Sequence, residues 1–402
     1  MKSLLFVINT LGRGGAEVAL LNLLEHIDPK QYDIDLYVMV GQGELVHHVP
    51  GHVHLLNKKF DDTGVLDKKG KNKLIWHLFE NLLHVGSLTK NFPYICSNYK
   101  VMKKIGRIQY DKLLWKTIAD SAPKFEKEYD LAVAFLEGAS AYYVSKYVKA
   151  NKKAFFIHID YEMSGYTREL DNGCFDVADK IFTVSEEVRD SFLRVYPEYK
   201  NITEISHNLV DHEKIIERSK EPRGFEDQFD GKRILTVARL HKQKALEVSI
   251  KAMKIILEKG YHVRWYVLGE GDERGYLESL IKELGLQKDF LLCGVRDNPF
   301  PYYRQCDLYV HCSKYEGRSI AIQEAEILGC PIIVSDCPGN RLQVVHEKNG
   351  LITEFKEEKI AEAIMRLLDN PEFAAELGKR AAEINNSSED LPKLLNLVGK
   401  KS

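Results

Sequence analysis

Two glutamates in the last third of the chain have neighbours suited to binding a phosphorylated sugar. Glu316 lies in a polar, glycine-containing segment, and Glu324 follows after seven intervening residues in an amphipathic stretch that ends at Gly329. That stretch predicts a helix, and the first N–H groups and the dipole of a helix favour a diphosphate. A helical carboxylate can accept hydrogen bonds from ribose hydroxyls. The pattern predicts a site for a sugar nucleotide; the alternative is an ordinary helix with a surface glutamate and a glycine stop.

The segment from Ser313 to Asp336 resembles the Glu-x7-Glu signature of the retaining family 4 glycosyltransferases, which have the GT-B fold. The residues that match are Glu316-Gly317, Glu324-Ala325, Gly329-Cys330-Pro331 and Ile333-Val334-Ser335-Asp336. The resemblance implies that Glu316 holds hydroxyls of the donor sugar and that Glu324 holds the ribose. It also implies that the donor meets Gly317, Arg318, Ser319 and Ile320. Arg318 replaces an aromatic residue that is common in the family, and this version resembles a bacterial branch linked to cell-surface polysaccharides.

Two cations follow an apolar run that predicts a strand over 233–238. Arg239 and Lys244 would lie at the carboxyl end of that strand, where an arginine fork and a mobile lysine charge can neutralise a leaving diphosphate. They resemble the family's Arg-Leu…Lys-Gly motif, although Ala245 stands where glycine is usual. Lys242 is a competing candidate, and surface charge at a helix start is the alternative interpretation.

Gly14 and Gly15 follow the first predicted strand and open a helix, so the backbone there can approach a phosphate. Glu17 stands where a dinucleotide fingerprint needs glycine, so that fingerprint fails. The resemblance implies that Gly14-Gly15 lie beside the reacting phosphate. The alternative is a tight strand-to-helix turn.

His158 ends an apolar strand in the first half of the chain. A satisfied structural histidine is the alternative here, whereas the resemblance implies a hydrogen bond from His158 to the transferred sugar, with Asp160 able to orient it. The resemblance further implies that the backbone at Val295 meets the nucleobase.

The resemblance implies a reaction in which Glu316, His158, Arg239 and Lys244 form the catalytic set. Fixed dipoles and cations would stabilise the leaving phosphate. That phosphate would take the acceptor's proton, so no protein nucleophile is required. Since no Asp-x-Asp pair lies at a predicted strand end, we expect no essential metal, and no cofactor apart from the nucleoside-diphosphate sugar as substrate.

Strand-like runs alternate with helical patterns almost throughout, which predicts parallel sheets covered by helices. The α/β pattern and the resemblance together predict two tandem Rossmann-like domains that face each other across a cleft. We expect an acceptor-side domain over 1–207 with a helical insertion at about 60–128, a donor domain over 208–385, and a helix in 386–402 that crosses back to the first domain. The predicted strands lie near 4–9, 34–40, 52–56, 131–136, 154–158, 180–184, 203–206, 233–238, 263–268, 290–293, 308–312 and 331–335.

The composition of the 402 residues is that of a globular protein, with 44% hydrophobic and 29% charged residues. Seven scattered cysteines without a Cys-x-x-Cys pair argue against a disulfide framework and a zinc ribbon. No run approaches the roughly 18 apolar residues of a membrane span. We therefore expect a cytoplasmic protein, either soluble or peripheral on the inner face of the membrane.

Charge is unevenly distributed along the chain. Residues 58–127 contain 15 Lys/Arg and 7 Asp/Glu, whereas the whole chain has a net charge of −2. Lys68, Lys69 and Lys71 precede an aromatic, leucine-rich run, a pattern suited to an anionic bilayer. A solvated basic face is the alternative. No nucleic-acid module is recognised, so no nucleic-acid partner is expected.

Two other classes of function fit parts of the pattern. A non-catalytic nucleotide-sugar-binding or scaffolding protein is one, and the intact Glu316, Glu324, Arg239 and Lys244 count against it. A nicotinamide-dependent oxidoreductase is the other, and the failed glycine fingerprint counts against it. The expected partners are a nucleotide-sugar donor and a saccharide or lipid-linked acceptor, and the expected donor is a UDP-sugar.

Overall fold

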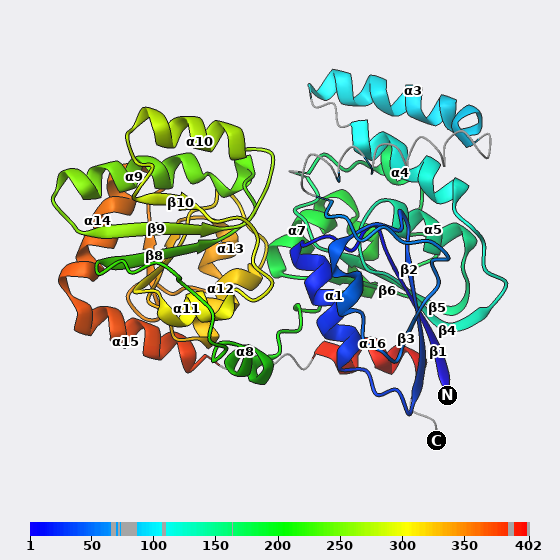
Figure 1. Cartoon of the computed structure of the whole chain (residues 1–402). Helices are drawn as coiled ribbons and strands as arrows, with labels where there is room; N and C mark the ends of the chain where they lie inside the picture. Colours follow the sequence, from blue (N-terminus) through cyan, green and yellow to red (C-terminus); the bar gives the residue numbers. More distant parts are fainter. Residues whose placement is uncertain are drawn as a thin grey trace. The chain divides into compact units, whose positions relative to one another are not determined.

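The computed structural model describes residues 1–65, 70, 73, 87–106, 110–162, 164–384 and 390–399. Two compact units make up the chain (Figure 1). Unit 1 comprises Met1–Leu209 together with Ser388–Ser402, and unit 2 comprises Val210–Ser387.

Unit 1 is built on a sheet of seven parallel strands in the order β3-β2-β1-β4-β5-β6-β7. Helices alternate with these strands along the chain; for example, α1 follows β1 and α5 follows β4. The strands are β1 (Lys2–Ile8), β2 (Tyr32–Val38), β3 (Val53–Leu55), β4 (Glu128–Ala134), β5 (Lys149–Ile157), β6 (Lys180–Thr183) and β7 (Thr203–Ile205). The helices are α1 (Gly15–Glu25), η1 (Glu44–His48), α3 (Ser87–Ile105), α4 (Tyr110–Ser121), α5 (Ala139–Tyr147), α6 (Arg168–Asp171), α7 (Glu186–Val195), η2 (Pro197–Ile202), α16 (Asp390–Leu395) and η4 (Asn396–Val398).

Unit 2 is built on a sheet of six parallel strands in the order β10-β9-β8-β11-β12-β13. Its strands are β8 (Lys232–Val237), β9 (Val263–Leu268), β10 (Phe290–Leu292), β11 (Leu308–His311), β12 (Ile332–Ser335) and β13 (Leu351–Thr353). Its helices are α8 (His212–Arg218), η3 (Lys242–Lys244), α9 (Leu246–Glu258), α10 (Arg274–Glu283), α11 (Phe300–Gln305), α12 (Ile320–Ile327), α13 (Pro338–Arg341), α14 (Glu357–Asp369) and α15 (Pro371–Ala382).

Continuous apolar runs form the central strands because both faces of a parallel sheet are covered. Every residue from Leu4 to Ile8 in β1 is fully buried, as is every residue from Ile332 to Val334 in β12. The prediction of an α/β fold with parallel sheets is confirmed, and all twelve predicted strands are present within a few residues of their expected ends. The thirteenth, β13, was missed because Leu351–Thr353 is only three residues long and gives no recognisable period.

The strand order of each unit reverses direction at one point, and polar residues of the sequence collect there. In unit 2 the order runs outward from β8 toward β10 on one side and from β11 toward β13 on the other. In unit 1 the corresponding neighbours are β1 and β4. Ligands of open α/β sheets bind outside the carboxyl ends of strands at such a switch point.

The basic stretch of the sequence is described only in part. Lys68, Lys69, Lys71 and the aromatic run that follows them lie outside the described residues. The described part of this interval contains α3, which packs against α4 and has no acidic residue (Figure 1).

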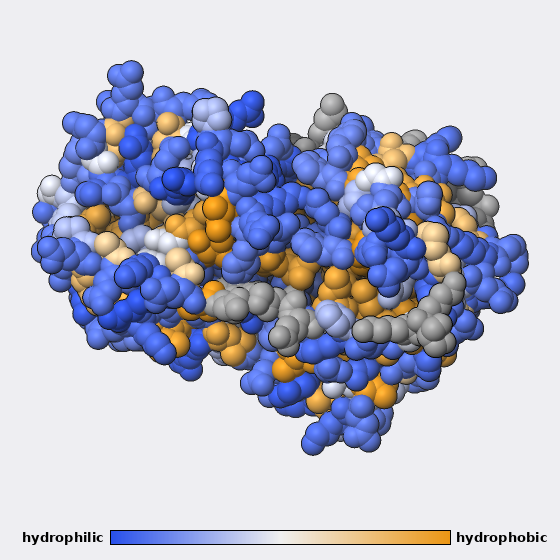
Figure 2. Space-filling model, turned by 90° about the horizontal axis from the view of Figure 1, so that it is seen from below, coloured by the Kyte–Doolittle hydropathy of each residue, from blue (hydrophilic) through white to orange (hydrophobic). Residues whose placement is uncertain are grey.

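Most of the face shown in Figure 2 is hydrophilic, with hydrophobic side chains in separate patches. Across the described ranges, no helix combines the length and the apolar character that crossing a membrane requires.

Candidate active site

Glu316 is the centre of a hydrogen-bonded cluster at the carboxyl ends of β8 and β11. Its Oε1 atom accepts hydrogen bonds from Lys244 Nζ, from His311 Nε2 at 2.9 Å and from Ser313 Oγ at 2.5 Å. The side chain of Glu316 is only 8% exposed. Since no described residue donates to Oε2, that oxygen is the one available to a ligand hydroxyl.

The cluster holds Glu316 ionised. Burial by itself would raise the pKa of Glu316, but the charge of Lys244 and the hydrogen bond from His311 lower the pKa well below its usual value. Burial and the neighbouring Lys244 charge lower the pKa of His311, which therefore remains neutral. Tyr309 Oη lies 3.0 Å from His311 Nδ1 and can donate to it, which leaves the Nε2 proton for Glu316.

The two cations predicted for the diphosphate both follow β8, but their surroundings differ. Arg239 is exposed and makes no ion pair with any described residue. Lys244 is half-buried and pairs with Glu316. The competing candidate, Lys242, is exposed on the same short helix. Ala245 adopts a left-handed conformation with a φ of 46°, which explains why glycine would suit this position.

Glu324 points its carboxylate at a tyrosine from the preceding helix. Tyr303 Oη donates to Glu324 Oε2 at 2.9 Å and lies 3.2 Å from the Ala321 carbonyl oxygen. Burial raises the pKa of Glu324 to about 7, although the Tyr303 hydrogen bond and the charge of Arg218 oppose that rise. The group therefore changes charge near neutral pH.

The side chain of Gln343 holds the backbone after Glu316 through two hydrogen bonds to Ser319. Gln343 is buried, its Oε1 accepts from the Ser319 N–H at 2.7 Å, and its Nε2 donates to the Ser319 carbonyl at 2.9 Å. The Ser319 N–H is therefore engaged by Gln343 in this structure. The backbone N–H groups of Gly317 and Ile320, before and at the start of α12, have no hydrogen-bond acceptor among the described residues. The side chain of Arg318 is half-buried.

Val295 follows β10 in the same unit. Its carbonyl accepts a hydrogen bond from Arg296 Nη1 at 3.2 Å, and Gly294 forms an isolated bridge with Gly269. The backbone that the resemblance assigns to the nucleobase is therefore held against the end of β9.

Gly14 and Gly15 lie at the carboxyl end of β1 in unit 1. Gly14 caps the start of α1, and a Cβ atom there would lie 2.2 Å from Glu17 Oε2. The pair therefore makes a close turn next to the switch point of unit 1, and Glu17 occupies the space that a side chain would need.

His158 follows β5 and is half-buried in the same unit. Burial lowers its pKa to about 4, so the imidazole is neutral. The Asp160 carboxylate accepts a hydrogen bond from Ser191 Oγ at 2.7 Å. Glu137 accepts a hydrogen bond from the His158 backbone N–H, and no motif in the sequence marks this glutamate.

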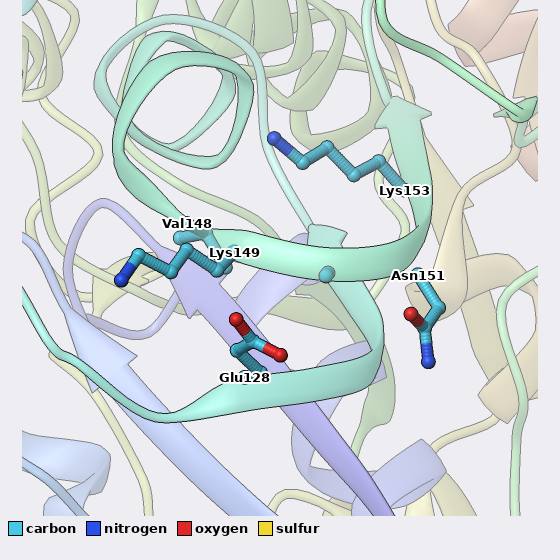
Figure 3. A pocket seen from close by; sticks show the side chains of 6 residues that line it. Glu128, Val148, Lys149, Asn151 and Lys153 are labelled. Atoms are coloured by element: carbon cyan, nitrogen blue, oxygen red, sulfur yellow. The ribbon is translucent and has the colours of Figure 1, made fainter.

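A pocket of about 340 Å³ opens at the amino ends of β4 and β5, the opposite edge of the unit 1 sheet (Figure 3). Glu128, Lys149 and Lys153 are among its lining residues. The side chains of Lys149 and Asn151 diverge rather than converge on one point, so they do not form a ligand cradle. Within the described ranges, no group of three or more His, Cys, Asp or Glu side chains could hold a metal ion.

Several residues of the site carried no sequence signal strong enough to find them. His311 and Ser313 end a predicted strand, and a polar pair at a strand end was the only available clue. Tyr303 and Gln343 reach the site from 21 and 24 residues away along the chain, where no motif marks them.

Comparisons with known proteins agree with this arrangement. Residues 217–384 match the family model described as "Glycosyl transferases group 1". An uncharacterized glycosyltransferase of Methanocaldococcus jannaschii is 32% identical over 225 residues, which cover 53% of this chain and 55% of that protein. Another from the same organism is 29% identical over 40% of this chain and 41% of its own length, so the chain spans about half the length of these relatives.

A third relative covers more of the chain. It is the Campylobacter jejuni N-acetylgalactosamine-N,N'-diacetylbacillosaminyl-diphospho-undecaprenol 4-alpha-N-acetylgalactosaminyltransferase, which is 24% identical over 89% of this chain and 87% of its own length.

Solved structures share the fold over the whole chain. Anabaena HepE in complex with UDP-glucose has a TM-score of 0.67 at 16% identity, over 99% of this chain and 98% of its own. Staphylococcus aureus TarM has a TM-score of 0.65 at 14% identity, over 100% of both chains. Residues 217–384 thus match the group 1 glycosyltransferases, and the chain that carries them has the GT-B fold.

Proposed function

We propose that this chain is a retaining glycosyltransferase that moves a sugar from a nucleoside-diphosphate sugar, a UDP-sugar, to a saccharide or lipid-linked acceptor in cell-surface polysaccharide biosynthesis. The observation that carries the proposal is the pairing of Lys244 with Glu316 at the switch point of unit 2, with Arg239 exposed on the same strand end. A carboxylate for sugar hydroxyls and two cations for a diphosphate are the groups that such a donor requires.

The names of similar proteins support the choice of substrates. The Campylobacter jejuni relative is named for a diphospho-undecaprenol acceptor, and the Anabaena structure contains UDP-glucose. A Staphylococcus aureus relative, 25% identical over 56% of this chain and 45% of its own length, is named a poly(ribitol-phosphate) alpha-N-acetylglucosaminyltransferase.

In the proposed reaction, the bond between the anomeric carbon and the β-phosphate oxygen breaks while a bond to the acceptor oxygen forms. The acceptor's proton passes to the leaving phosphate on the same face, which retains the anomeric configuration without a protein nucleophile. Arg239 and Lys244 stabilise the charge that grows on the phosphate, and preorganised charges of this kind are usually the largest catalytic contribution. Neither a metal ion nor a cofactor is needed in this scheme.

Glu316 and Glu324 hold the two ends of the donor. When the diphosphate attracts Lys244, His311 and Ser313 keep Glu316 Oε1 in place, so Oε2 remains aimed at the sugar. Glu324 hydrogen-bonds the ribose, either as an acceptor when ionised or as a donor and acceptor when protonated. The N–H groups of Gly317 and Ile320 are offered to the donor.

Unit 1 serves the acceptor in this proposal. His158 contacts the transferred sugar, and Gly14-Gly15 approach the reacting phosphate. The described part of the basic stretch supports contact with an anionic membrane surface, because α3 carries Lys90, Lys100, Lys103 and Lys104 in exposed positions and Phe92 is 62% exposed.

A thermal-shift experiment with UDP, GDP, ADP and their sugars tests the donor assignment. A ligand that binds only the folded state stabilises it by about 2.7 kcal/mol at 100 times its Kd. We expect UDP to raise the Tm of the wild type, and Glu324→Ala to abolish that rise. Tyr303→Phe is the matched control, because it removes the hydrogen bond to Glu324 while the carboxylate stays.

Stabilisation by GDP or ADP alone would reject UDP, and an equal shift in Glu324→Ala would reject the ribose assignment. Binding of UDP-sugar without release of UDP, in the presence of lipid-linked and saccharide acceptors, would favour a non-catalytic binding protein. Proton NMR of the glycosidic product from an α-linked donor tests retention, which requires an α-linked product.

A further inference from the structure

Glu137 is a buried carboxylate at the carboxyl end of β4 that has no role in the reaction described above. It is 4% exposed. Its Oε1 atom accepts hydrogen bonds from the backbone N–H groups of His158 and, at 3.3 Å, of Ile159. Its carbonyl accepts from Asn9 Nδ2 at 2.8 Å. One residue therefore ties together the ends of β1, β4 and β5 at the switch point of unit 1.

The same end of β4 also holds the imidazole. The His158 ring hydrogen-bonds the Phe135 backbone, and its centroid lies 5.1 Å from that of the Phe135 ring. Nε2 is buried and has no hydrogen-bond partner among the described residues. Nδ1 is therefore the nitrogen that faces the Phe135 carbonyl and carries the proton, which leaves a lone pair on Nε2.

Packing alone does not explain a carboxylate here. A buried charge is costly, and an apolar side chain of similar size would fill the space at lower cost. Burial raises the pKa of Glu137 to about 7, while the N–H groups of His158 and Ile159 and the charge of Lys112 from α4 oppose that rise. The charge of Asp171 of α6 also interacts with Glu137.

We propose that Glu137 is a positioning residue for His158: by holding the backbone of His158 and Ile159, it fixes the imidazole so that Nε2 accepts a hydrogen bond from a hydroxyl of the bound sugar. The inference rests on the proposed function for the part that concerns the sugar. The link between Glu137 and the orientation of the ring does not depend on it. A buried Nε2 lone pair without a partner is the feature that a sugar hydroxyl would satisfy.

Nuclear magnetic resonance of the full-length protein tests the link directly. With ¹⁵N-labelled histidine, and with His158→Gln to assign the signals, we expect the wild type above pH 7 to show His158 as a single tautomer protonated at Nδ1. In Glu137→Gln, the amide NH₂ group is a donor and cannot accept hydrogen bonds from the two backbone N–H groups, so we expect a mixture of tautomers. Asp35→Asn is the control, since Asp35 is equally buried at 4% exposure but bonds Lys127 and Tyr129.

The wild type alone provides a second measurement, which does not require the variant to fold. As pH falls through about 7, Glu137 takes up a proton, and its hydrogen bonds from the N–H groups of His158 and Ile159 weaken. The tautomer ratio of His158 should therefore change with a midpoint near pH 7. Identical His158 spectra in wild type and Glu137→Gln, or a tautomer ratio that is constant from pH 8.5 to 6, would overturn the proposal.

Activity separates this inference from the proposed function. For UDP release from a UDP-sugar, we expect kcat of Glu137→Gln to fall by 10- to 100-fold with little change in KM, because a small misplacement of a contact residue costs that much. The acid limb of the wild-type profile near pH 7 should also disappear. Full activity in His158→Gln would reject the role of His158 in the reaction, whereas full activity in Glu137→Gln alone would reject the positioning role.

Discussion

At the residue scale, Lys244 and Lys242 lie two positions apart and have different environments. Lys244 neutralises Glu316, whose side chain is 8% exposed, whereas Lys242 is exposed to solvent. The sequence could not separate these lysines because both stand at a similar distance from Arg239. Two features distinguish them: Lys244 is more buried, and it pairs with the carboxylate of Glu316, which follows β11 rather than β8.

Removing the Lys244 charge should destabilise unit 2. Lys244→Met leaves Glu316 buried without its cation, and breaking a buried pair from one side costs about 3 kcal/mol. We expect a clear fall in Tm and the loss of stabilisation by UDP. Lys242→Met, the control, should stay within about 0.5 kcal/mol of the wild type. Equal effects of the two substitutions on Tm would contradict the assignment of Lys244.

At the element scale, the segment that begins with α13 supports the loop after Glu316. Gly339 approaches so closely that a Cβ atom would lie 2.1 Å from the Gly317 carbonyl oxygen and 2.4 Å from that of Glu316. Gln343, four residues later, binds both polar backbone groups of Ser319. The position of the loop after Glu316 therefore depends on the segment that begins with α13, which contributes no predicted ligand contact.

Gly339→Ala should displace that loop. We expect UDP to bind at least about ten-fold more weakly, a loss of about 1.4 kcal/mol, because the new methyl group meets backbone atoms rather than a side chain that can move. Gly275→Ala in α10 is the control, since no described atom lies within 4 Å of its Cβ position. That control should be stabilising by up to about 1 kcal/mol. Isothermal titration with UDP measures both, and unchanged affinity in Gly339→Ala would show that the loop tolerates the shift.

At the scale of the whole molecule, the end of the chain belongs to unit 1. Asp390 accepts hydrogen bonds from the His207 N–H at 2.8 Å and its ring at 3.1 Å, and Lys393 Nζ donates to the Ile205 carbonyl at 3.0 Å. Burial raises the pKa of Asp390, but the bonds from His207 and Lys393 outweigh this and lower it to about 2.

Because the folded-state pKa of Asp390 lies below its unfolded value, its contribution to stability is present above pH 4 and is lost as pH falls toward 2. Asp390→Asn should therefore cost about 2 kcal/mol at pH 7, and the difference from the wild type should shrink below pH 4. Melting curves at pH 7 and 3.5 measure this, with the exposed Glu169→Gln as control. A difference that is constant with pH would show that the carboxylate charge is not involved.

The sequence by itself determined the class of fold and the location of the donor motif. Apolar runs such as Leu4–Ile8 and Ile332–Val334 predict buried parallel strands because burial on both faces removes the need for polar alternation. The spacing of Glu316 and Glu324 is likewise local, since one loop and one helix contain both.

Only the tertiary structure decided which groups hold those residues in place. His311 and Lys244 both contact Glu316 because β8 and β11 are neighbours in the sheet, although 67 residues separate His311 from Lys244 along the chain. Glu137 contacts the His158 backbone because β4 and β5 are neighbours in the sheet, although 21 residues separate Glu137 from His158 along the chain. Strand order brings these side chains together, and the physical reason that the sequence does not reveal them is that each contact depends on pairing between distant segments rather than on local periodicity.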